Sequence, residues 1–430
     1  MNYMATIEQH ESEVRSYVRG FPTVFDTARG SYMYNTDGEA YLDFFAGASV
    51  MNYGHNNSEL KQALLDYIGS DRITHSMDMA SVMRAEFLQA FRDIILAPRG
   101  LDYRVQFPGP TGTNAVESAL KLARKATGRT DIVAFTNAFH GMTLGALSVT
   151  GNQFKRDGAG VPLNDTHTLP FDGYIGGVDT LSYFETLLND GASGIGHPAA
   201  VIVETIQAEG GVNVAGGEWL KRLQAICQRH DILFIVDDIQ TGNGRTGYFF
   251  SFEEFGLNPD IVAVSKSLSG YGFPLALTLI KPEYDLWTPG EHNGTFRGFN
   301  PALATAKRTL ELFWSDDRFA REVRAKGEHV REALEAMLTR HPQARGCPRG
   351  RGLMQAVEFA NRDLADKITE KAFQRQLIIE TAGADDETLK LLPPLTTDYA
   401  DLDKGLSIIE ESLVAAMDEL GIRGPSAAVN

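Results

Sequence analysis

Short apolar runs alternate with helix-like segments through the middle of the chain. The runs at 200–204 and 232–237 are almost wholly apolar and are bounded by polar residues. Between them, residues 217–229 show the apolar spacing of an amphipathic helix. A strand with one wet face alternates apolar and polar residues, whereas a continuously apolar strand is buried on both faces. This order therefore predicts a parallel sheet that is covered by helices on both sides.

Neighbouring segments extend the same pattern. Residues 113–125 have the spacing of a helix, and the apolar run at 132–135 follows as a strand. Another apolar run, at 260–265, predicts a further strand of the sheet. All of these segments lie within residues 61–310, and we expect that span to form one large domain.

The last part of the chain has a different order of elements. Beyond the large domain we expect a long helix, strands near 352–359 and 389–392, and a last helix from about residue 398. That order is typical of a smaller α+β domain, here residues 311–430. Its tail at 424–430 has the composition of a frayed terminus.

Residues 1–60 are predicted to join the smaller domain. They contain two alternating runs, at 31–34 and 40–44, around Asp37-Gly38. Asp-Gly is frequent in tight turns between paired strands because glycine adopts a positive φ without strain. We therefore expect a hairpin at this place.

Composition narrows the class of protein. With 43% hydrophobic residues among 430, the chain can bury the core of two or three domains. Its net charge of −16 argues against a nucleic-acid partner, which needs a basic face. Cys227 and Cys347 are too few for a disulfide framework or a metal cluster, and Cys227 lies on the apolar side of a helix. The first residues lack a signal-peptide pattern and no apolar run reaches membrane-spanning length, so we expect a cytoplasmic enzyme of small metabolites, without metal.

A first candidate site lies at 108–114, where glycines and hydroxyl residues lead directly into a helix. Free N–H groups at a helix start, with the helix dipole behind them, bind phosphate. The alternative is plain helix capping by Thr111 or Thr113.

Two charged residues follow buried strands of the predicted sheet. Asp237 ends the run at 232–237, and Lys266 follows the run at 260–265. Ligands of open α/β sheets bind at the carboxyl ends of the strands. A carboxylate there needs a positive partner such as a protonated pyridine nitrogen, and a desolvated lysine is a good amine for Schiff-base chemistry. The alternatives are a helix cap for Asp237 and a surface lysine for Lys266.

An aromatic residue, Phe139, follows the strand at 132–135. It could stack on a flat ring, although such an aromatic is more often part of a core. Taken together, a phosphate site, a stacking aromatic, a carboxylate for a pyridine nitrogen and a lysine for an aldehyde are consistent with one ligand, pyridoxal 5′-phosphate (PLP).

The segment 236–247, Val-Asp-Asp-Ile-Gln-Thr-Gly-Asn-Gly-Arg-Thr-Gly, is followed by Lys266 29 residues after Asp237. This arrangement resembles the class III aminotransferases of PLP fold type I, and the likeness runs from about Tyr17 to about Leu420. It implies an α/β fold with a large, mostly parallel sheet domain and a smaller α+β domain. The family pattern normally has glutamate where Asp238 stands, and this departure leaves Asp237 intact.

The resemblance implies a role for each matching residue. Lys266 would form the Schiff base and carry the proton, and Asp237 would pair with the pyridine nitrogen. The other residues that the resemblance assigns to PLP are Ile239 on the ring face, Gln240 at the phenolic oxygen, Gly112 and Thr113 at the phosphate, and Phe139 as the stacking aromatic. Thr295 would reach the phosphate of a neighbouring subunit, which implies a homodimer or higher homo-oligomer. Glu209 resembles the family's switch carboxylate beside the substrate.

Two positions bear on the substrate. Members of the class that use GABA or acetylornithine carry arginine where Met142 stands, so a neutral side chain there argues against both substrates. Lys390 stands where most of the class has an arginine for the α-carboxylate, and a lysine cannot make that planar two-bond grip.

Several longer stretches, among them 111–124, 141–147, 156–163 and 290–298, resemble the branch of the class that uses 2,4-diaminobutyrate. That likeness implies glutamate as donor and aspartate 4-semialdehyde as acceptor. Residues 299–301 depart from the expected pattern, which leaves open a related enzyme of another pathway that uses another ω-amino acid or diamine, such as GABA or ornithine. A PLP aminomutase or decarboxylase, or a non-catalytic protein of the same fold, are further alternatives; retention of both Lys266 and Asp237 argues against the last.

Overall fold

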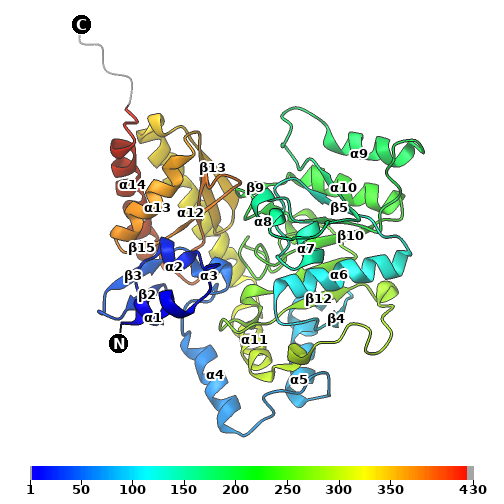
Figure 1. Cartoon of the computed structure of the whole chain (residues 1–430). Coiled ribbons are helices and arrows are strands. Elements are labelled where there is room, and N and C mark those ends of the chain that lie inside the picture. The colour runs from blue at the N-terminus through cyan, green and yellow to red at the C-terminus, as the bar shows by residue number, and fades with distance from the viewer. Residues whose placement is uncertain (1, 424–430) are drawn as a thin grey trace.

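The computed structural model describes residues 2–423 and has two lobes (Figure 1). The tail at 424–430, predicted to fray, lies outside the described residues. The larger lobe is built around a seven-stranded sheet in the order β4-β12-β11-β10-β7-β5-β6. Its strands are β4 (Arg104–Gln106), β5 (Ile132–Phe135), β6 (Thr166–Leu169), β7 (Ala200–Val203), β10 (Leu233–Asp237), β11 (Ile261–Val264) and β12 (Leu277–Ile280).

The pairing of this sheet is mostly parallel, as predicted. Strands β11, β10, β7, β5 and β6 pair in parallel, and β12 runs antiparallel to both β11 and β4. Every residue of β5, β7, β10 and β11 is buried, which explains why these strands are continuously apolar in the sequence.

Helices cover both faces of the sheet. Helix α6 (Gly112–Thr127) packs against one face and shares a core with Ile235. Helix α10 (Gly217–Arg229) packs against the other face, where Phe234 and buried Cys227 belong to a second core. The other helices of the larger lobe are α4 (Ser58–Gly69), α5 (Val82–Ala90), α7 (Leu144–Ser148), α8 (Gln153–Asp157), α9 (Thr180–Asn189) and α11 (Asn300–Phe313).

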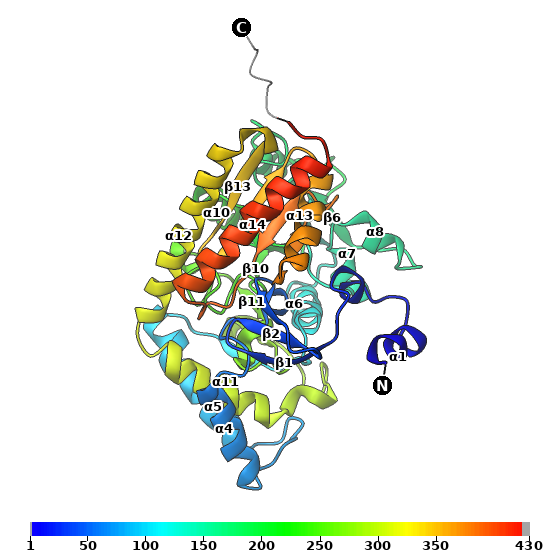
Figure 2. The same ribbon diagram turned by 90° about the vertical axis from the view of Figure 1, so that its left-hand side faces the viewer.

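The smaller lobe holds a four-stranded antiparallel sheet in the order β13-β14-β17-β16. Its strands are β13 (Gly346–Arg351), β14 (Met354–Phe359), β16 (Glu380–Ala382) and β17 (Thr388–Leu391). Figure 2 shows the three helices of this lobe on its outer side, namely α12 (Arg318–Arg340), α13 (Asp363–Gln374) and α14 (Tyr399–Glu419). The long helix predicted at the start of this lobe is confirmed as α12, which has 23 residues.

The N-terminal part of the chain meets the C-terminal part in a second four-stranded sheet. Its order is β1 (Phe25–Arg29), β2 (Tyr32–Asn35), β3 (Ala40–Asp43) and β15 (Leu377–Ile378). The predicted hairpin is confirmed, because β2 and β3 pair antiparallel and Gly38 has a φ of 82°. Strand β15 pairs in parallel with β3. The exact domain boundaries, 1–60, 61–310 and 311–430, stay a prediction.

A buried arginine ties these parts together. The guanidinium of Arg245 donates to Ser49 Oγ at 2.8 Å, to the carbonyl oxygen of Leu353 at 3.0 Å and to that of Pro393 at 2.7 Å. A buried charge is stable only when its donors are bonded, so Arg245 holds the N-terminal segment, the larger lobe and the smaller lobe in one arrangement. Within residues 2–423, no helix combines the length and the apolar character that crossing a membrane requires.

Candidate active site

A cavity of about 300 Å³ lies at the carboxyl ends of the parallel strands. Its walls come from the start of α6, the loop after β5, the ends of β7 and β10, and the turn after β11. Nine of the residues that the sequence analysis singled out line it, namely Gly112, Thr113, Phe139, Met142, Glu209, Asp237, Ile239, Gln240 and Lys266. Residues from distant segments, several of them selected because they follow buried strands, therefore lie together around one cavity.

Asp237, at the end of β10, is 4% exposed and has a close partner in His140. His140 Nδ1 lies 2.8 Å from Asp237 Oδ2, and the backbone N–H of Ile239 donates to Asp237 Oδ1 at 3.1 Å. The carboxylate is thus oriented from two sides. His140 was not singled out from the sequence, although it directly follows Phe139.

Lys266 begins a short 3-10 turn (Lys266–Ser269) directly after β11, with a positive φ of 52°. Its amine donates to the carbonyl oxygen of Ala48 at 2.8 Å. Burial lowers the pKa of Lys266 below its ordinary value, because desolvation disfavours the charged form. A lysine in this state supplies a free amine more readily than a surface lysine does.

The carbonyl that Lys266 contacts lies in an unusual turn. Ala46, Gly47, Ala48 and Ser49 all have positive φ values, between 48° and 74°. Each non-glycine residue in this conformation costs about 1–2 kcal/mol. Because the turn presents the Ala48 carbonyl to both Lys266 and Gln240, its strain is located where the site is assembled.

The start of α6 leaves backbone donors free at one end of the cavity. Thr111 occupies the cap position without a side-chain capping bond, and the Thr113 hydroxyl lies 2.7 Å from that of Thr143. A side chain at Gly112 would meet Ile239 carbons at 3.0 Å, so glycine allows Ile239 to lie over this end. Neither threonine side chain caps the helix, so the capping alternative does not hold.

Phe139 lines the cavity beside a buried carboxylic acid. Its backbone N–H donates to Glu204 Oε2 at 3.1 Å, and Lys155 Nζ lies 4.4 Å from its ring centroid. Burial, and then the nearby charge of Asp237, raise the pKa of Glu204 well above its usual value. Glu204 was not singled out from the sequence, although it directly follows the buried strand β7 and the rule that found Asp237 applies to it equally.

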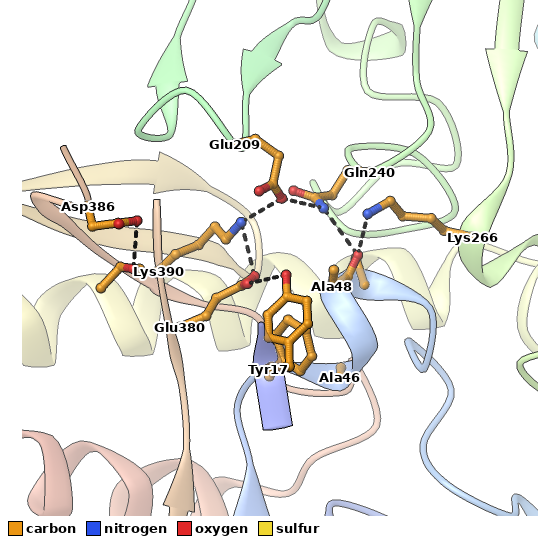
Figure 3. A network of polar contacts seen from close by, with 12 residues as sticks. Tyr17, Ala46, Ala48, Glu209, Gln240, Lys266, Glu380, Asp386 and Lys390 are labelled. Carbon is orange, nitrogen blue, oxygen red and sulfur yellow. Dashed lines mark hydrogen bonds and ion pairs between the residues drawn. The ribbon is translucent and has the colours of Figure 1, made fainter. Parts of the chain in front are cut away.

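A chain of polar contacts runs from the cavity into the smaller lobe (Figure 3). Gln240 Nε2 donates to Glu209 Oε1 at 3.1 Å, and Lys390 Nζ donates to the same oxygen at 2.9 Å. Lys390 also lies 3.0 Å from Glu380 Oε1, and the Tyr17 hydroxyl donates to Glu380 Oε2 at 3.4 Å. The Lys390 side chain is fully buried, so Glu209 separates it from the cavity.

The charge of each residue in this series of polar contacts depends on both its burial and its ion pairs. For Glu209, burial favours the neutral acid, but Lys390 and Lys266 outweigh it and lower the pKa to about 2. For Glu380, burial dominates and raises the pKa to about 7. Burial also opposes the charge of Lys390, but its two carboxylates raise its pKa above the ordinary value.

Two predicted site residues do not line the cavity of this chain. Lys390 lies behind Glu209, and exposed Thr295 lies in a 3-10 turn (Thr295–Gly298), where its carbonyl oxygen accepts from His75 Nε2 at 2.8 Å. Thr295 is therefore not brought to the phosphate end of the cavity of its own chain.

Comparison with known proteins decides the family. Residues 15–413 match the model described as Aminotransferase class-III. The chain belongs to the class III aminotransferases. It is 55% identical over 416 residues to diaminobutyrate–2-oxoglutarate transaminase of Halalkalibacterium halodurans, covering 96% of this chain and 97% of that protein. It is 56% identical to the protein of that name from Vibrio cholerae, covering 96% and 100% of the two chains.

Solved aminotransferase structures share the fold. An ornithine aminotransferase from Toxoplasma gondii superimposes with a TM-score of 0.83 at 26% identity, covering 97% of this chain and 95% of that one. An aminotransferase from Bacillus anthracis has a TM-score of 0.86 at 22% identity and supports the fold alone, covering 96% and 98%. The predicted fold class, PLP cofactor and aminotransferase activity are thereby confirmed.

The residues of the cavity fit PLP. Gln240 Oε1 and His140 Nε2 are buried and have no hydrogen-bond partner among the described residues. A buried polar atom without a partner is costly, and a ligand that bonds it removes that cost. The start of α6, a buried amine and an oriented carboxylate line one cavity, and they are the groups that the phosphate, aldehyde and pyridine nitrogen of this cofactor require.

Proposed function

We propose that this class III aminotransferase transfers an amino group from L-glutamate to L-aspartate 4-semialdehyde. The products are 2-oxoglutarate and L-2,4-diaminobutyrate. The observation that carries the proposal is the 55–56% identity, over nearly the whole length, to proteins named diaminobutyrate–2-oxoglutarate transaminase, that is, for the two products. Consistent with that name, the structure has a buried lysine amine and an oriented carboxylate in one cavity.

PLP would be held by residues of one chain and one residue of a second copy. Gly112 and Thr113 would bind the phosphate at the start of α6, with Phe139 and Ile239 on the two faces of the ring. Asp237 would pair with the pyridine nitrogen, and Gln240 would bond the phenolic oxygen. Thr295 is exposed and away from its own cavity, so we propose that it serves the phosphate of a partner subunit in a homodimer.

Bound PLP supplies an aldehyde that condenses with amines and a protonated ring that accepts electrons. The chain provides the proton transfers and the charge. Lys266, whose pKa burial lowers, would remove the proton from the reacting carbon of the donor and return it at the cofactor carbon. Asp237, fixed by His140 and by the N–H of Ile239, would keep the ring nitrogen positive. Both half-reactions use one cavity, so kinetics should be ping-pong.

Substrate selection would depend on Met142 and on the Glu209–Lys390 pair. Met142 lines the cavity as a neutral, half-exposed side chain, which offers no charge to the distal carboxylate of GABA. Glu209 covers Lys390, so a substrate carboxylate can reach the lysine only when Glu209 moves aside. We further propose that the enzyme is cytoplasmic and acts in ectoine biosynthesis, because the proposed product is 2,4-diaminobutyrate.

An acceptor panel tests this function directly. The holoenzyme is mixed with glutamate, and loss of the cofactor absorbance band reports the first half-reaction. Aspartate 4-semialdehyde should then restore the band faster than succinate semialdehyde or glutamate 5-semialdehyde, the aldehydes that correspond to GABA and ornithine. A faster reaction with either of these would replace the proposal by the related ω-amino acid activity. A reaction that consumes no second oxo substrate would indicate an aminomutase or decarboxylase instead.

A further inference from the structure

Two carboxylates share one lysine in the buried chain of contacts beside the cavity. Lys390 Nζ lies 2.9 Å from Glu209 Oε1 and 3.0 Å from Glu380 Oε1. Among residues 2–423, Lys390 is the one cation within 4.0 Å of either carboxylate. Glu209 is charged at neutral pH, and one ammonium group cannot neutralise two carboxylates. The cluster therefore carries more negative than positive charge when Glu380 is ionised.

The extra carboxylate is built into the fold. Glu380 on β16 stands directly opposite Lys390 on β17 in the antiparallel register, and it is 7% exposed. Its second oxygen accepts a hydrogen bond from Tyr17 of α2 (Tyr17–Gly20) at 3.4 Å. A lysine is a compact point charge that can face two carboxylates from different directions, whereas a guanidinium favours one planar grip. The Lys390–Glu380 pair therefore differs in charge from a lone arginine at the same place.

Glutamate is the amino donor in the forward direction of the proposed reaction, and 2,4-diaminobutyrate is the donor in the reverse direction. These two donors differ in the sign of their net charge. At neutral pH glutamate carries one net negative charge, and 2,4-diaminobutyrate, with two amines and one carboxylate, carries one net positive charge. Charges interact more strongly in a partly desolvated site than in bulk water, because less water screens them. An excess negative charge in the cluster beside the cavity thus attracts the cationic donor and repels the anionic one.

We propose that Glu380 is a specificity-determining residue, whose carboxylate gives the Lys390 cluster a net negative charge that favours the cationic diamino acid over the dicarboxylate. Glu380 lines no part of the cavity, so it acts through the charge of Lys390 and Glu209. This inference rests on the proposed function, because it takes 2,4-diaminobutyrate as one of the two donors.

The preference should also depend on pH. The groups that face Glu380 are Lys390 on β17, Glu209 after β8 (Ile206–Gln207), Tyr17 on α2 and, further off, Lys266 after β11. Burial first, opposed by Lys390 and reinforced by Glu209, raises the pKa of Glu380 to about 7. As the pH falls through this value, Glu380 takes up a proton and the extra negative charge is lost. The preference should then move toward glutamate.

The test compares the two half-reactions in Glu380→Gln and wild-type holoenzyme. Rapid mixing with glutamate, or with 2,4-diaminobutyrate, gives a specificity constant for each donor from the cofactor absorbance. The ratio of the glutamate constant to the diaminobutyrate constant should rise about tenfold in the variant. It should also become less dependent on pH between 6 and 8, a change that general loss of structure would not produce.

The matched control is Asp386→Asn. Asp386 follows β16, is exposed and accepts from Thr381 Oγ1 at 3.0 Å, away from Lys390 (Figure 3). Its variant loses the same charge from the same segment and should leave the ratio unchanged. Tyr17→Phe serves as a second variant if Glu380→Gln does not fold. Without the phenol donor the carboxylate form of Glu380 is less stable, so the pH at which the ratio changes should move upward.

The outcomes separate the two proposals. If wild type reacts with both donors and the ratio in Glu380→Gln stays within twofold of wild type, or falls, the role of Glu380 is wrong and the proposed function stands. An equal rise in Asp386→Asn would also overturn it. If wild type reacts with glutamate but not with 2,4-diaminobutyrate, the proposed function fails, and the inference fails with it.

Discussion

At the scale of single residues, the site depends on where a few charges are placed. Asp237 is held by His140 at 2.8 Å and by the backbone of Ile239 at 3.1 Å, so its carboxylate cannot turn away from the cavity. Asp238, the next residue, points elsewhere and accepts from Thr241 Oγ1 and from the N–H of Ser251. The two adjacent aspartates therefore have different contacts, and variants of the two can be compared.

Asp237→Asn should lower the rate of the glutamate half-reaction by about a thousandfold, which corresponds to roughly 4 kcal/mol. The amide keeps the shape but cannot keep the ring nitrogen positive. Stopped-flow absorbance measures the rate. Asp238→Asn is the control: it loses one acceptor, so it should lower the melting temperature and leave the rate nearly unchanged. A drop of only a few fold in Asp237→Asn would make Asp237 a structural cap.

Met142→Arg should raise activity toward GABA relative to 2,4-diaminobutyrate by about tenfold, or roughly 1.4 kcal/mol. Met142 is 53% exposed at the cavity wall, so an arginine has room there and can reach a distal carboxylate. The measurement is the ratio of specificity constants for the two amines in both proteins. A wild type that already prefers GABA, or a ratio that does not move, would contradict the role given to Met142.

At the scale of elements, strand ends and helix starts determine the cavity. The start of α6 and the loop after β10 approach each other so closely that a side chain at position 112 would collide with Ile239. Contacts of this kind depend on the distance between two elements, which no local sequence pattern specifies.

Gly112→Ala should weaken PLP retention about tenfold, because the added methyl group meets Ile239 carbons at 3.0 Å and shifts the residue proposed to lie on the ring. Dialysis followed by cofactor absorbance measures retention. Gly69→Ala is a matched control, since Gly69 ends helix α4 and has open space around its Cα. Equal retention in both variants would show that Ile239 does not contact the cofactor.

The sequence predicted the large sheet and much of the cavity because both rest on local patterns. Buried parallel strands are continuously apolar, and Asp237 and Lys266 follow such strands. Glu380 and Ala48 could not be found in this way. Glu380 lies on a strand of three residues whose partner is decided by the smaller lobe, and Ala48 contributes a backbone carbonyl that leaves no mark in the sequence. Their positions follow from tertiary packing alone.

At the scale of the whole molecule, the proposed active site is shared between two subunits through Thr295. Thr295 is exposed and lies outside the cavity of its own chain. A single chain would then lack one phosphate ligand, and pairing of two copies would complete both sites.

A mixed dimer of Thr295→Ala and Lys266→Ala chains tests this arrangement. Its one site with an intact Lys266 receives Thr295 from the partner, so the dimer should keep about half of wild-type activity and normal PLP retention at that site. Differential tags isolate the mixed dimer for assay. If Thr295 instead served its own chain, the surviving site would lose PLP as readily as in the Thr295→Ala homodimer.

The parallel pairing of β3 with β15 has a consequence for synthesis in the cell. Leu42 leaves the ribosome early, but its partner Leu377 comes near the end of the chain. At about 5–20 residues per second, roughly 20–70 seconds pass before the two strands can meet. During that time the nascent hairpin has an open edge, to which another unfinished chain can pair. The order of translation therefore leaves the N-terminal hairpin as the part of this enzyme that waits longest for its native neighbour.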